Sequence, residues 1–315
     1  MPVVLFVVSS LVLLILVSGG YTFFVACGRR KDFPWFDEQE IKKTSYGKHY
    51  DYLLAGDKFI KEHNAQPVYM ESFDGTKLHA MWIPAEKPKG TVLMAHGYRS
   101  NKLLDFGLAF DLYHNLGMNI LVPDQRGNGK SGGKYITFGV KESRDVACWI
   151  AYHNKTFGEY ELVLSGLSMG ASTMLYLADQ DLPENVKGII ADCGFTSAKD
   201  IISVVFRRVV HLPPMASVWV ADLFARLFAG FSLTEKDTRK TLKNSKLPVF
   251  MVHGVEDGYV PCEMTEEGYT ACTSPKQLLL VEGADHGTSF VVDREKYLEC
   301  ILSFLKANVA GFQEA

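Results

Sequence analysis

Short apolar runs alternate with longer amphipathic stretches along most of the chain. The apolar runs each have the length of a buried parallel strand and cover residues 91–95, 119–123, 161–165, 188–192, 248–253 and 277–281. Helix-length amphipathic segments lie between most of them, at 102–116, 140–154 and 169–178. This alternation predicts an α/β fold with a mainly parallel sheet.

Two earlier runs, 68–72 and 78–83, flank Asp74-Gly75, a pair typical of hairpin turns. We therefore expect eight strands, flanked by helices, in a domain over residues 67–315. Residues 28–66 are polar with a helical pattern and are interpreted as a linker and a bracing helix. Active sites of such sheets gather at the carboxyl ends of the strands.

The N-terminal segment has a different pattern, because residues 1–27 are apolar and carry no charged side chain. As a helix the segment would span about 40 Å, more than the about 30 Å of a bilayer's hydrocarbon core. We expect a single membrane-spanning helix here. A cleaved signal peptide is the alternative, as is a lipoprotein-like site ending at Cys27. Both normally begin with basic residues, and none precedes this apolar run.

A basic cluster, Arg29, Arg30 and Lys31, follows the apolar segment. The positive-inside rule then places the large C-terminal part in the cytoplasm. One short cluster carries this orientation, so the opposite side of the membrane stays open.

Composition narrows the class of protein. Of the 315 residues 47% are hydrophobic and 22% charged, which excludes a disordered chain. The net charge of −3 argues against nucleic acid as a partner. The six cysteines form no CxxC pair and no zinc spacing, and we expect reduced thiols, with a Cys262–Cys272 disulfide as a weaker alternative.

One long segment, residues 197–247, interrupts the alternation of strands and helices. It is rich in apolar residues and is broken by Pro213-Pro214. We interpret it as a helical cap that forms a lid over a pocket. Additional core packing and contact with a membrane surface are the alternatives.

Residues 166–170 read Gly-Leu-Ser-Met-Gly, between an apolar run and a helical stretch. This strand–turn–helix context is the one that a nucleophile elbow requires. The flanking glycines leave room for the sharp turn that would expose Ser168. We therefore take Ser168 as the candidate nucleophile.

A serine hydroxyl needs a general base, and the base needs an acid that orients it. Asp257 and His286 each follow a predicted strand, and the chain order Ser, Asp, His fits the elbow. His286 would accept the proton of Ser168 and Asp257 would orient His286. Asp192, which also ends a strand, is the rival acid, whereas His253 and His96 are interpreted as structural.

Acyl transfer also needs donors for a developing oxyanion. We expect the backbone N–H of Met169, which follows the serine, and that of Tyr98, in the loop after the strand 91–95. Arg99 in the same loop is a weaker candidate for binding an acidic substrate group. The glycine-rich loop 123–133 matches no phosphate-binding motif, and we expect Asp124 and Arg126 to hold it by hydrogen bonds.

Together these motifs resemble the α/β-hydrolase superfamily over about residues 68–305. They comprise His96-Gly97, the Asp-x-Arg-Gly-x-Gly-x-Ser loop from Asp124, the turn at Ser168, His-Gly-x-x-Asp-x-x-Val-Pro from His253, and Asp-His-Gly from Asp285. The chain is most similar to bacterial membrane-associated hydrolases of the serine aminopeptidase S33-like and dienelactone hydrolase-like branches. The resemblance implies a Ser–His–Asp triad, no metal, no cofactor, and a cap after the sixth strand.

The resemblance does not fix the substrate, because esterases, thioesterases and peptidases share these motifs. The apolar insertion and the membrane segment favour a small-molecule ester or thioester with an apolar acyl group. An S33-like peptidase that removes N-terminal residues is the second hypothesis. A non-catalytic, membrane-anchored interaction module is the third.

Overall fold

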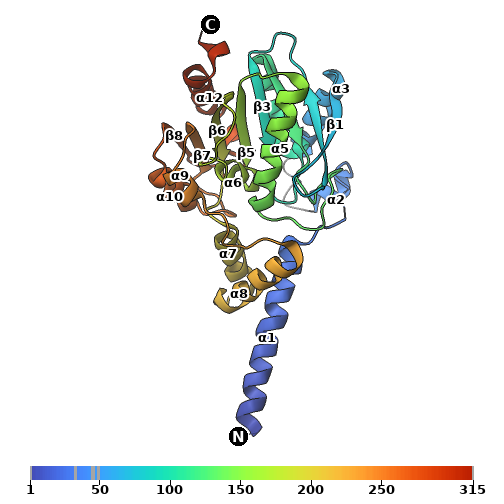
Figure 1. The fold of residues 1–315 in the computed structure, drawn as a ribbon, viewed down its shortest axis with the longest axis vertical. Helices are drawn as coiled ribbons and strands as arrows, with labels where there is room; N and C mark the ends of the chain where they lie inside the picture. The colour runs from blue at the N-terminus through green and yellow to red at the C-terminus, as the bar shows by residue number, and fades with distance from the viewer. Residues whose placement is uncertain (1, 32–33, 44–46, 48–49, 314–315) are drawn as a thin grey trace.

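The eight predicted strands form one sheet in the order β1-β2-β4-β3-β5-β6-β7-β8, as the computed structural model shows (Figure 1). The structure describes residues 2–31, 34–43, 47 and 50–313. The first two strands pair antiparallel and β2 pairs antiparallel with β4, whereas every later pairing is parallel. The predicted fold class is therefore confirmed.

The strands begin and end within a few residues of their predicted bounds. They are β1 Gln66–Glu71, β2 Lys77–Ile83, β3 Gly90–Ala95, β4 Met118–Pro123, β5 Leu162–Leu167, β6 Val186–Asp192, β7 Val249–Gly254 and β8 Lys276–Val281. The strands β3, β4 and β7, none of which is at an edge of the sheet, are buried along their whole length. Burial on both faces explains why these strands are continuous apolar runs rather than alternating ones.

Helices cover both faces of the sheet, and alternate strand residues pack against each layer. Val92 and Met94 of β3 belong to the core formed with α3 (Tyr50–Glu62), α4 (Lys102–Asn115) and α12 (Arg294–Asn308). Leu93 and Ala95 face the other core. Its helices are α5 Val140–Phe157, α6 Met169–Leu175, α9 Thr238–Lys243 and α10 Glu263–Ala271.

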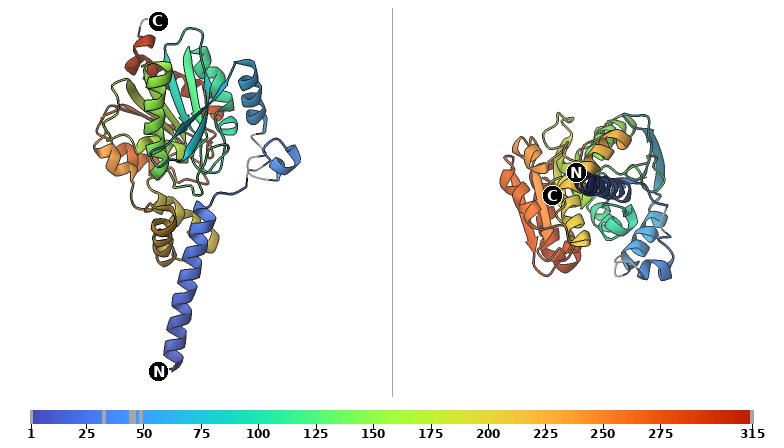
Figure 2. Two further views of the ribbon diagram at one scale, coloured as in Figure 1. Left: turned by 45° about the vertical axis from the view of Figure 1, so that its right-hand side comes forward. Right: turned by 90° about the horizontal axis from the view of Figure 1, so that it is seen from below.

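The N-terminal segment forms one long helix, α1 (Pro2–Cys27), which leaves the domain from the end opposite the C-terminus (Figure 1). By length and composition it is able to cross a membrane, a test that a signal sequence near an N-terminus also passes. Its first residues project free of the rest of the chain, whereas its last third lies against other helices (Figure 2).

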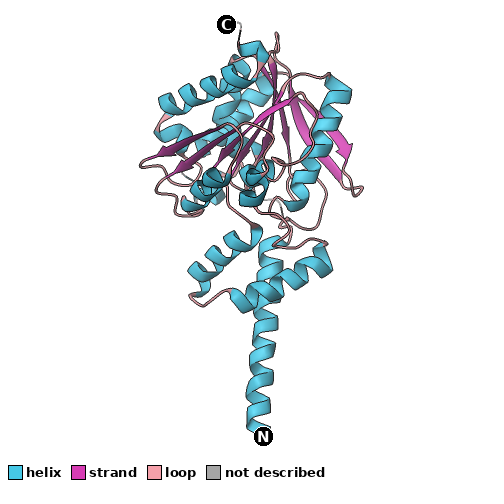
Figure 3. Cartoon of the chain, turned by 60° about the vertical axis from the view of Figure 1, so that its left-hand side comes forward, coloured by secondary structure: helices cyan, strands magenta, loops and turns pink. Residues whose placement is uncertain are grey.

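Those other helices come from the 197–247 insertion. They are α7 (Ala198–Val210), α8 (Met215–Phe224) and the π-helical turn η2 (Ala225–Ala229). Figure 3 shows them beside the upper part of α1, between the sheet and the free end of that helix. Phe23 and Cys27 of α1 share a core with Val218, Ala221 and the segment around Phe138.

Three further short helices complete the description. They are α2 Glu38–Lys42, α11 Ser289–Val292 and the 3₁₀ turn η3 Ala310–Phe312. The expected bracing helix is α3, which packs on α4. All six cysteines are free, so the alternative Cys262–Cys272 disulfide is absent.

Candidate active site

Ser168 sits at the sharp turn between β5 and α6, with φ of 57° and ψ of −116°. Few residues other than glycine adopt a positive φ, and here the flanking glycines make the turn sterically feasible. A Cβ at Gly166 would lie 2.2 Å from the carbonyl oxygen of Gly170. A Cβ at Gly170 would lie 1.8 Å from that of Ala95. The glycines of the sequence motif and the positive φ of Ser168 thus both follow from the sharpness of this turn.

The turn brings the predicted serine, histidine and aspartate together. The Ser168 hydroxyl lies 3.0 Å from Nε2 of His286, and Nδ1 of His286 lies 2.7 Å from Oδ2 of Asp257. Ser168 and Asp257 are buried, whereas His286 is half-buried. A chain of this kind can move a proton from a hydroxyl to an imidazole that a carboxylate orients.

Asp257 has more hydrogen-bond partners than the single contact with His286 that the sequence predicted. Its Oδ1 accepts backbone N–H bonds from Tyr259 at 2.7 Å and Val260 at 2.8 Å. Its Oδ2 lies 3.1 Å from Nε2 of the buried His253. Burial by itself would raise the pKa of Asp257, but the hydrogen bonds from His253 and His286 outweigh it and hold that pKa below the ordinary value.

The rival acid Asp192 is engaged elsewhere. Its carboxyl accepts a hydrogen bond from the Tyr297 hydroxyl at 3.1 Å, and burial raises its pKa. The backbone carbonyl of Asp192, in contrast, accepts the N–H of Ser168 at 2.8 Å. Asp192 therefore supports the turn, while Asp257 contacts the imidazole.

Tyr98 lies in the loop after β3, whereas Met169 follows Ser168 as the first residue of α6. Neither backbone N–H has a hydrogen-bond acceptor among the residues that the structure describes. Asp105 of α4 fixes the Tyr98 loop, because its carboxylate accepts the N–H of Gly97 at 2.6 Å and the hydroxyl of Ser100 at 2.5 Å. No signal in the sequence indicates this role, since Asp105 lies in an ordinary amphipathic helix.

The His96 ring holds the same loop from inside. It contacts the Gly97 carbonyl at 2.8 Å and accepts the N–H of Gln125 at 3.0 Å. Burial lowers the pKa of His96, which favours the neutral ring that this arrangement needs. The interpretation of His96 as a residue that shapes the loop agrees with these contacts.

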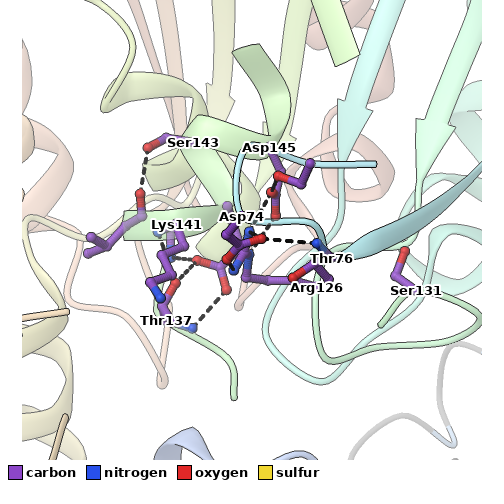
Figure 4. Close-up of polar contacts among 12 residues, drawn as sticks. Asp74, Thr76, Arg126, Ser131, Thr137, Lys141, Ser143 and Asp145 are labelled. Atoms are coloured by element: carbon purple, nitrogen blue, oxygen red, sulfur yellow. Dashed lines mark hydrogen bonds and ion pairs between the residues drawn. The ribbon is translucent and has the colours of Figure 1, made fainter. Parts of the chain in front are cut away.

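The loop 123–133 is held by buried ion pairs, as expected. The Asp124 carboxylate accepts a hydrogen bond from Nδ1 of His79 at 2.8 Å. It also pairs with the ammonium of Lys102, which lies on α4. Figure 4 shows Arg126 between Asp145, at 2.6 Å, and Asp74, at 2.9 Å. The loop is thus a rigid support beside Ser168.

A cavity of about 1420 Å³ opens over Ser168 and His286. Its walls include apolar side chains of α4, α11 and α12, among them Leu103, Phe290 and Ile301. Part of the wall comes from Arg30, Lys31, Trp35 and Phe36, in a segment that the sequence had indicated only as a linker. The aromatic pair Trp35-Phe36 in an otherwise polar stretch was the available signal.

No residue of 197–247 lines this cavity among those the structure describes. The insertion packs instead on α1 and on the Phe138 and Phe195 segments. The position of these helices gives no support to the lid interpretation. It agrees with the alternative of additional packing, whereas contact with a membrane surface stays a prediction.

Arg99 lines the cavity, but its guanidinium is engaged at the end of α1. Its guanidinium donates to the carbonyl oxygens of Val25 at 2.6 Å and Gly28 at 2.9 Å, at the C-terminal end of α1. The neighbouring Tyr98 hydroxyl donates to Ala26 at 2.7 Å. These donors satisfy carbonyls that a helix end leaves unpaired. The loop of Tyr98 is thereby joined directly to the N-terminal helix.

Cys193, Asp257 and His286 are one group whose ligand atoms lie within 4.8 Å of one another. Burial raises the pKa of the Cys193 thiol well above its ordinary value, which keeps it protonated, and a thiol must lose its proton to bind a metal. Asp257 and His286 are already hydrogen-bonded to each other. This group is poorly suited to a metal ion, and the expected absence of a cofactor stays a prediction.

The sheet order, the strained turn at Ser168 and the adjacent Asp257–His286 pair define an α/β-hydrolase. Residues 86–234 match the family of serine aminopeptidases S33. The chain is 30% identical over 223 residues to the uncharacterized protein YqkD of Bacillus subtilis, an alignment that covers 70% of this chain and 72% of YqkD. The chain belongs to the serine aminopeptidase S33 family of α/β-hydrolases.

Other similar proteins agree with this fold. The uncharacterized protein YfhR of Escherichia coli K12 is 26% identical over 254 residues, 77% of this chain and 82% of YfhR. The esterase Pf2001 of Pyrococcus furiosus superposes with a TM-score of 0.66 at 23% identity, over 80% of this chain and 94% of that chain. An acylaminoacyl peptidase superposes with a TM-score of 0.60 at 17% identity, over 78% and 41%.

Proposed function

We propose that the protein is a membrane-anchored serine hydrolase that cleaves a carboxylic ester or thioester. The observation that carries the proposal is the Ser168–His286–Asp257 chain of hydrogen bonds at the floor of a partly apolar cavity. The cavity accommodates an acyl chain, and the apolar helix α1 provides the anchor.

In the proposed reaction His286 takes the proton of Ser168 as the hydroxyl oxygen bonds to the carbonyl carbon of the substrate. The backbone N–H groups of Tyr98 and Met169 stabilise the oxyanion of the tetrahedral intermediate. The bond to the alcohol or thiol breaks, and His286 passes the proton to the leaving group. Water then attacks the acyl-enzyme with His286 as base, which releases the acid and restores Ser168.

A fluorophosphonate probe tests this proposal on the detergent-solubilised full chain. We expect labelling of the wild-type protein and none of the Ser168→Ala and His286→Ala variants. Ser203→Ala is a matched control, since that hydroxyl only bonds the carbonyl of Lys199 within its own helix. Folded wild-type protein that fails to label would instead favour the non-catalytic interaction module.

A peptidase remains the second candidate, because Asp192 lines the cavity and its buried Oδ1 has no hydrogen-bond partner among the described residues. Such an oxygen could accept a hydrogen bond from a substrate amine. Parallel assays with p-nitrophenyl esters and aminoacyl-naphthylamides separate the two candidates. We expect turnover of the esters, and preferential turnover of the naphthylamides would make the peptidase the better assignment.

A further inference from the structure

The insertion carries an exposed apolar surface, which we call the cap patch. It consists of side chains at the end of α7, in the loop that follows it, on α8 and on η2: Val209, Leu212, Met215, Trp219, Leu223 and Leu227. Trp219 is 71% exposed and Met215 72%. Met215, Trp219, Leu223 and Leu227 follow each other at intervals of four, so they form one stripe along the helix. Large exposed apolar patches on folded proteins mark surfaces that contact another protein or a membrane.

The opposite side of α8 packs on α1. A Cβ at Gly19 of α1 would lie 2.4 Å from Cβ of Val220, so the helices approach more closely than larger residues permit. The hydroxyls of Ser18 and Ser217 lie 2.9 Å apart and share a hydrogen bond. Phe23 and Phe24 pack against Phe224, with ring centroids 6.3 Å and 6.1 Å apart. The cap patch is therefore fixed in position relative to α1.

The length of α1 determines how deep the cap patch would lie in a bilayer that α1 spans. Residues 2–17 are exposed apart from the half-buried Ile15 and would span about 24 Å at about 1.5 Å per residue. The hydrocarbon core of a bilayer is about 30 Å thick and needs about 20 helical residues. A membrane-spanning α1 must therefore also immerse about four residues beyond Val17, and these are the residues that contact Ser217 and Val220 of α8.

The charged side chains near the cap patch are consistent with the same placement of α1 in a membrane. Residues 2–31 and 198–231 together hold seven basic and two acidic side chains, although the whole chain has a net charge of −3. Arg208 at the end of α7 donates to the carbonyl oxygens of Gly258 and Tyr259 on the hydrolase domain. Arg29 after α1 donates to the carbonyls of Gly129 and Ser131. Basic side chains at this level favour an anionic lipid surface.

We infer that the cap patch is a second membrane element, inserted into the hydrocarbon of the same leaflet that α1 enters. This inference rests on the membrane anchoring in the proposed function. A lipid bilayer is the occupant that the structure favours, because the patch continues the apolar surface of α1 and is bordered by basic residues. The cavity over Ser168 then lies at the membrane surface, since Arg30 and Lys31, which follow α1, line its wall.

Fluorescence of Trp219 tests the inference in the full chain. The protein is reconstituted into vesicles of phosphatidylcholine and phosphatidylglycerol, with or without bromine atoms midway along the acyl chains of the phosphatidylcholine. The difference between wild type and Trp219→Phe isolates the Trp219 emission. We expect brominated lipid to remove most of that emission and aqueous acrylamide to leave it largely intact.

A matched reporter on the far side of the domain controls for collisional quenching. Tyr160 precedes the amino end of β5, whereas Ser168 follows its carboxyl end. In the Trp219→Phe background, Tyr160→Trp adds an exposed tryptophan there. We expect the added emission to be quenched by acrylamide and unaffected by brominated lipid.

The outcomes separate the two proposals. Protein that floats with the vesicles while Trp219 is quenched only by acrylamide overturns the inserted patch and leaves the anchor intact. Trp219 that neither quencher reaches indicates a protein partner or a second copy on the patch, and also overturns it. Protein that fails to float with the vesicles overturns the anchor and the patch together, whereas loss of fluorophosphonate labelling concerns only the serine chemistry.

Discussion

The surroundings of Ser168 and the contact between α1 and α8 are built on different principles. Around Ser168, loops from six strands converge, and carboxylates such as the buried Asp257 and Asp124 and the half-buried Asp105 are each satisfied by several donors. Between α1 and α8, small and aromatic residues pack closely, with a hydrogen bond between Ser18 and Ser217. The geometry around Ser168 depends on individual hydrogen-bonding atoms, whereas the contact between α1 and α8 depends on the complementary shapes of their side chains.

This difference determines which substitutions each region tolerates. Removing one partner from a buried polar network leaves another group unsatisfied, so single-atom changes near Ser168 should affect chemistry strongly. A helix interface without buried charges responds mainly to added or lost volume. Changes in α1 should therefore affect stability and orientation rather than the chemical step.

The largest effect is expected from Asp257→Asn, which keeps the size of the side chain but alters its hydrogen bonding to His286. Loss of the oriented imidazole should lower kcat by about 10⁴-fold. Steady-state hydrolysis of a p-nitrophenyl ester measures it, and the exposed Asp181→Asn serves as a control that stays near wild type. A larger loss in Asp192→Asn would transfer the orienting role to Asp192.

Asp105→Ala should have the next largest effect, although the side chain has no part in the proposed reaction. Without its carboxylate the Gly97 N–H and the Ser100 hydroxyl lose their acceptor, and the Tyr98 loop can shift. We expect kcat to fall by about tenfold to a hundredfold, less than the about 10²–10³-fold lost with an entire oxyanion donor, at a nearly constant KM. Asp105→Asn retains one acceptor and should rescue most of the rate; a purely thermal defect with unchanged kcat would contradict the positioning role.

Gly19→Leu tests the helix contact by adding volume. The new side chain would meet Val220 and the carbonyl of Ser217, which should lower the free energy of unfolding by about 1–3 kcal/mol. Thermal unfolding in detergent measures this, with Val12→Leu on the free part of α1 as the control. Equal stability of the two variants would mean that α8 does not rest on α1 in solution.

Acid unfolding should distinguish a buried aspartate from an exposed one. Burial would raise the pKa of Asp124, but His79 and Lys102 together hold it below the ordinary value. Its contribution is then fully present above about pH 3.9, the pKa of the unfolded chain, and disappears as the pH falls toward the folded pKa. In denaturant titrations Asp124→Asn should be destabilised at neutral pH, with a difference from wild type that shrinks below about pH 4.

Asp181→Asn gives the smallest expected effect and serves as the comparison. Its ion pair with Lys246 is exposed, and solvent screens the attraction in such pairs. We expect unfolding close to wild type across the same pH range. A difference as large as that of Asp124→Asn would mean that burial is not what makes the Asp124 network important.

Several features could be predicted from the sequence because they have local causes. Buried parallel strands are uninterrupted apolar runs, and the turn at Ser168 admits only small neighbours, so both leave a pattern within a few residues. Asp257 and His286 were identified because chain order and position after a strand restrict the candidates. Asp105 could not be found, because its partners are a backbone N–H and a hydroxyl that become neighbours only once α4 packs on the sheet.

The sequence by itself determined the α/β-hydrolase fold, the apolar N-terminal helix and the residues that meet at Ser168. Only the tertiary structure decided that Arg99 binds the end of α1, that Trp35 and Phe36 form part of the cavity wall, and that the insertion packs on α1. The physical reason is that these contacts join distant segments through backbone carbonyls and complementary shape. Neither leaves a periodicity or a motif in the chain.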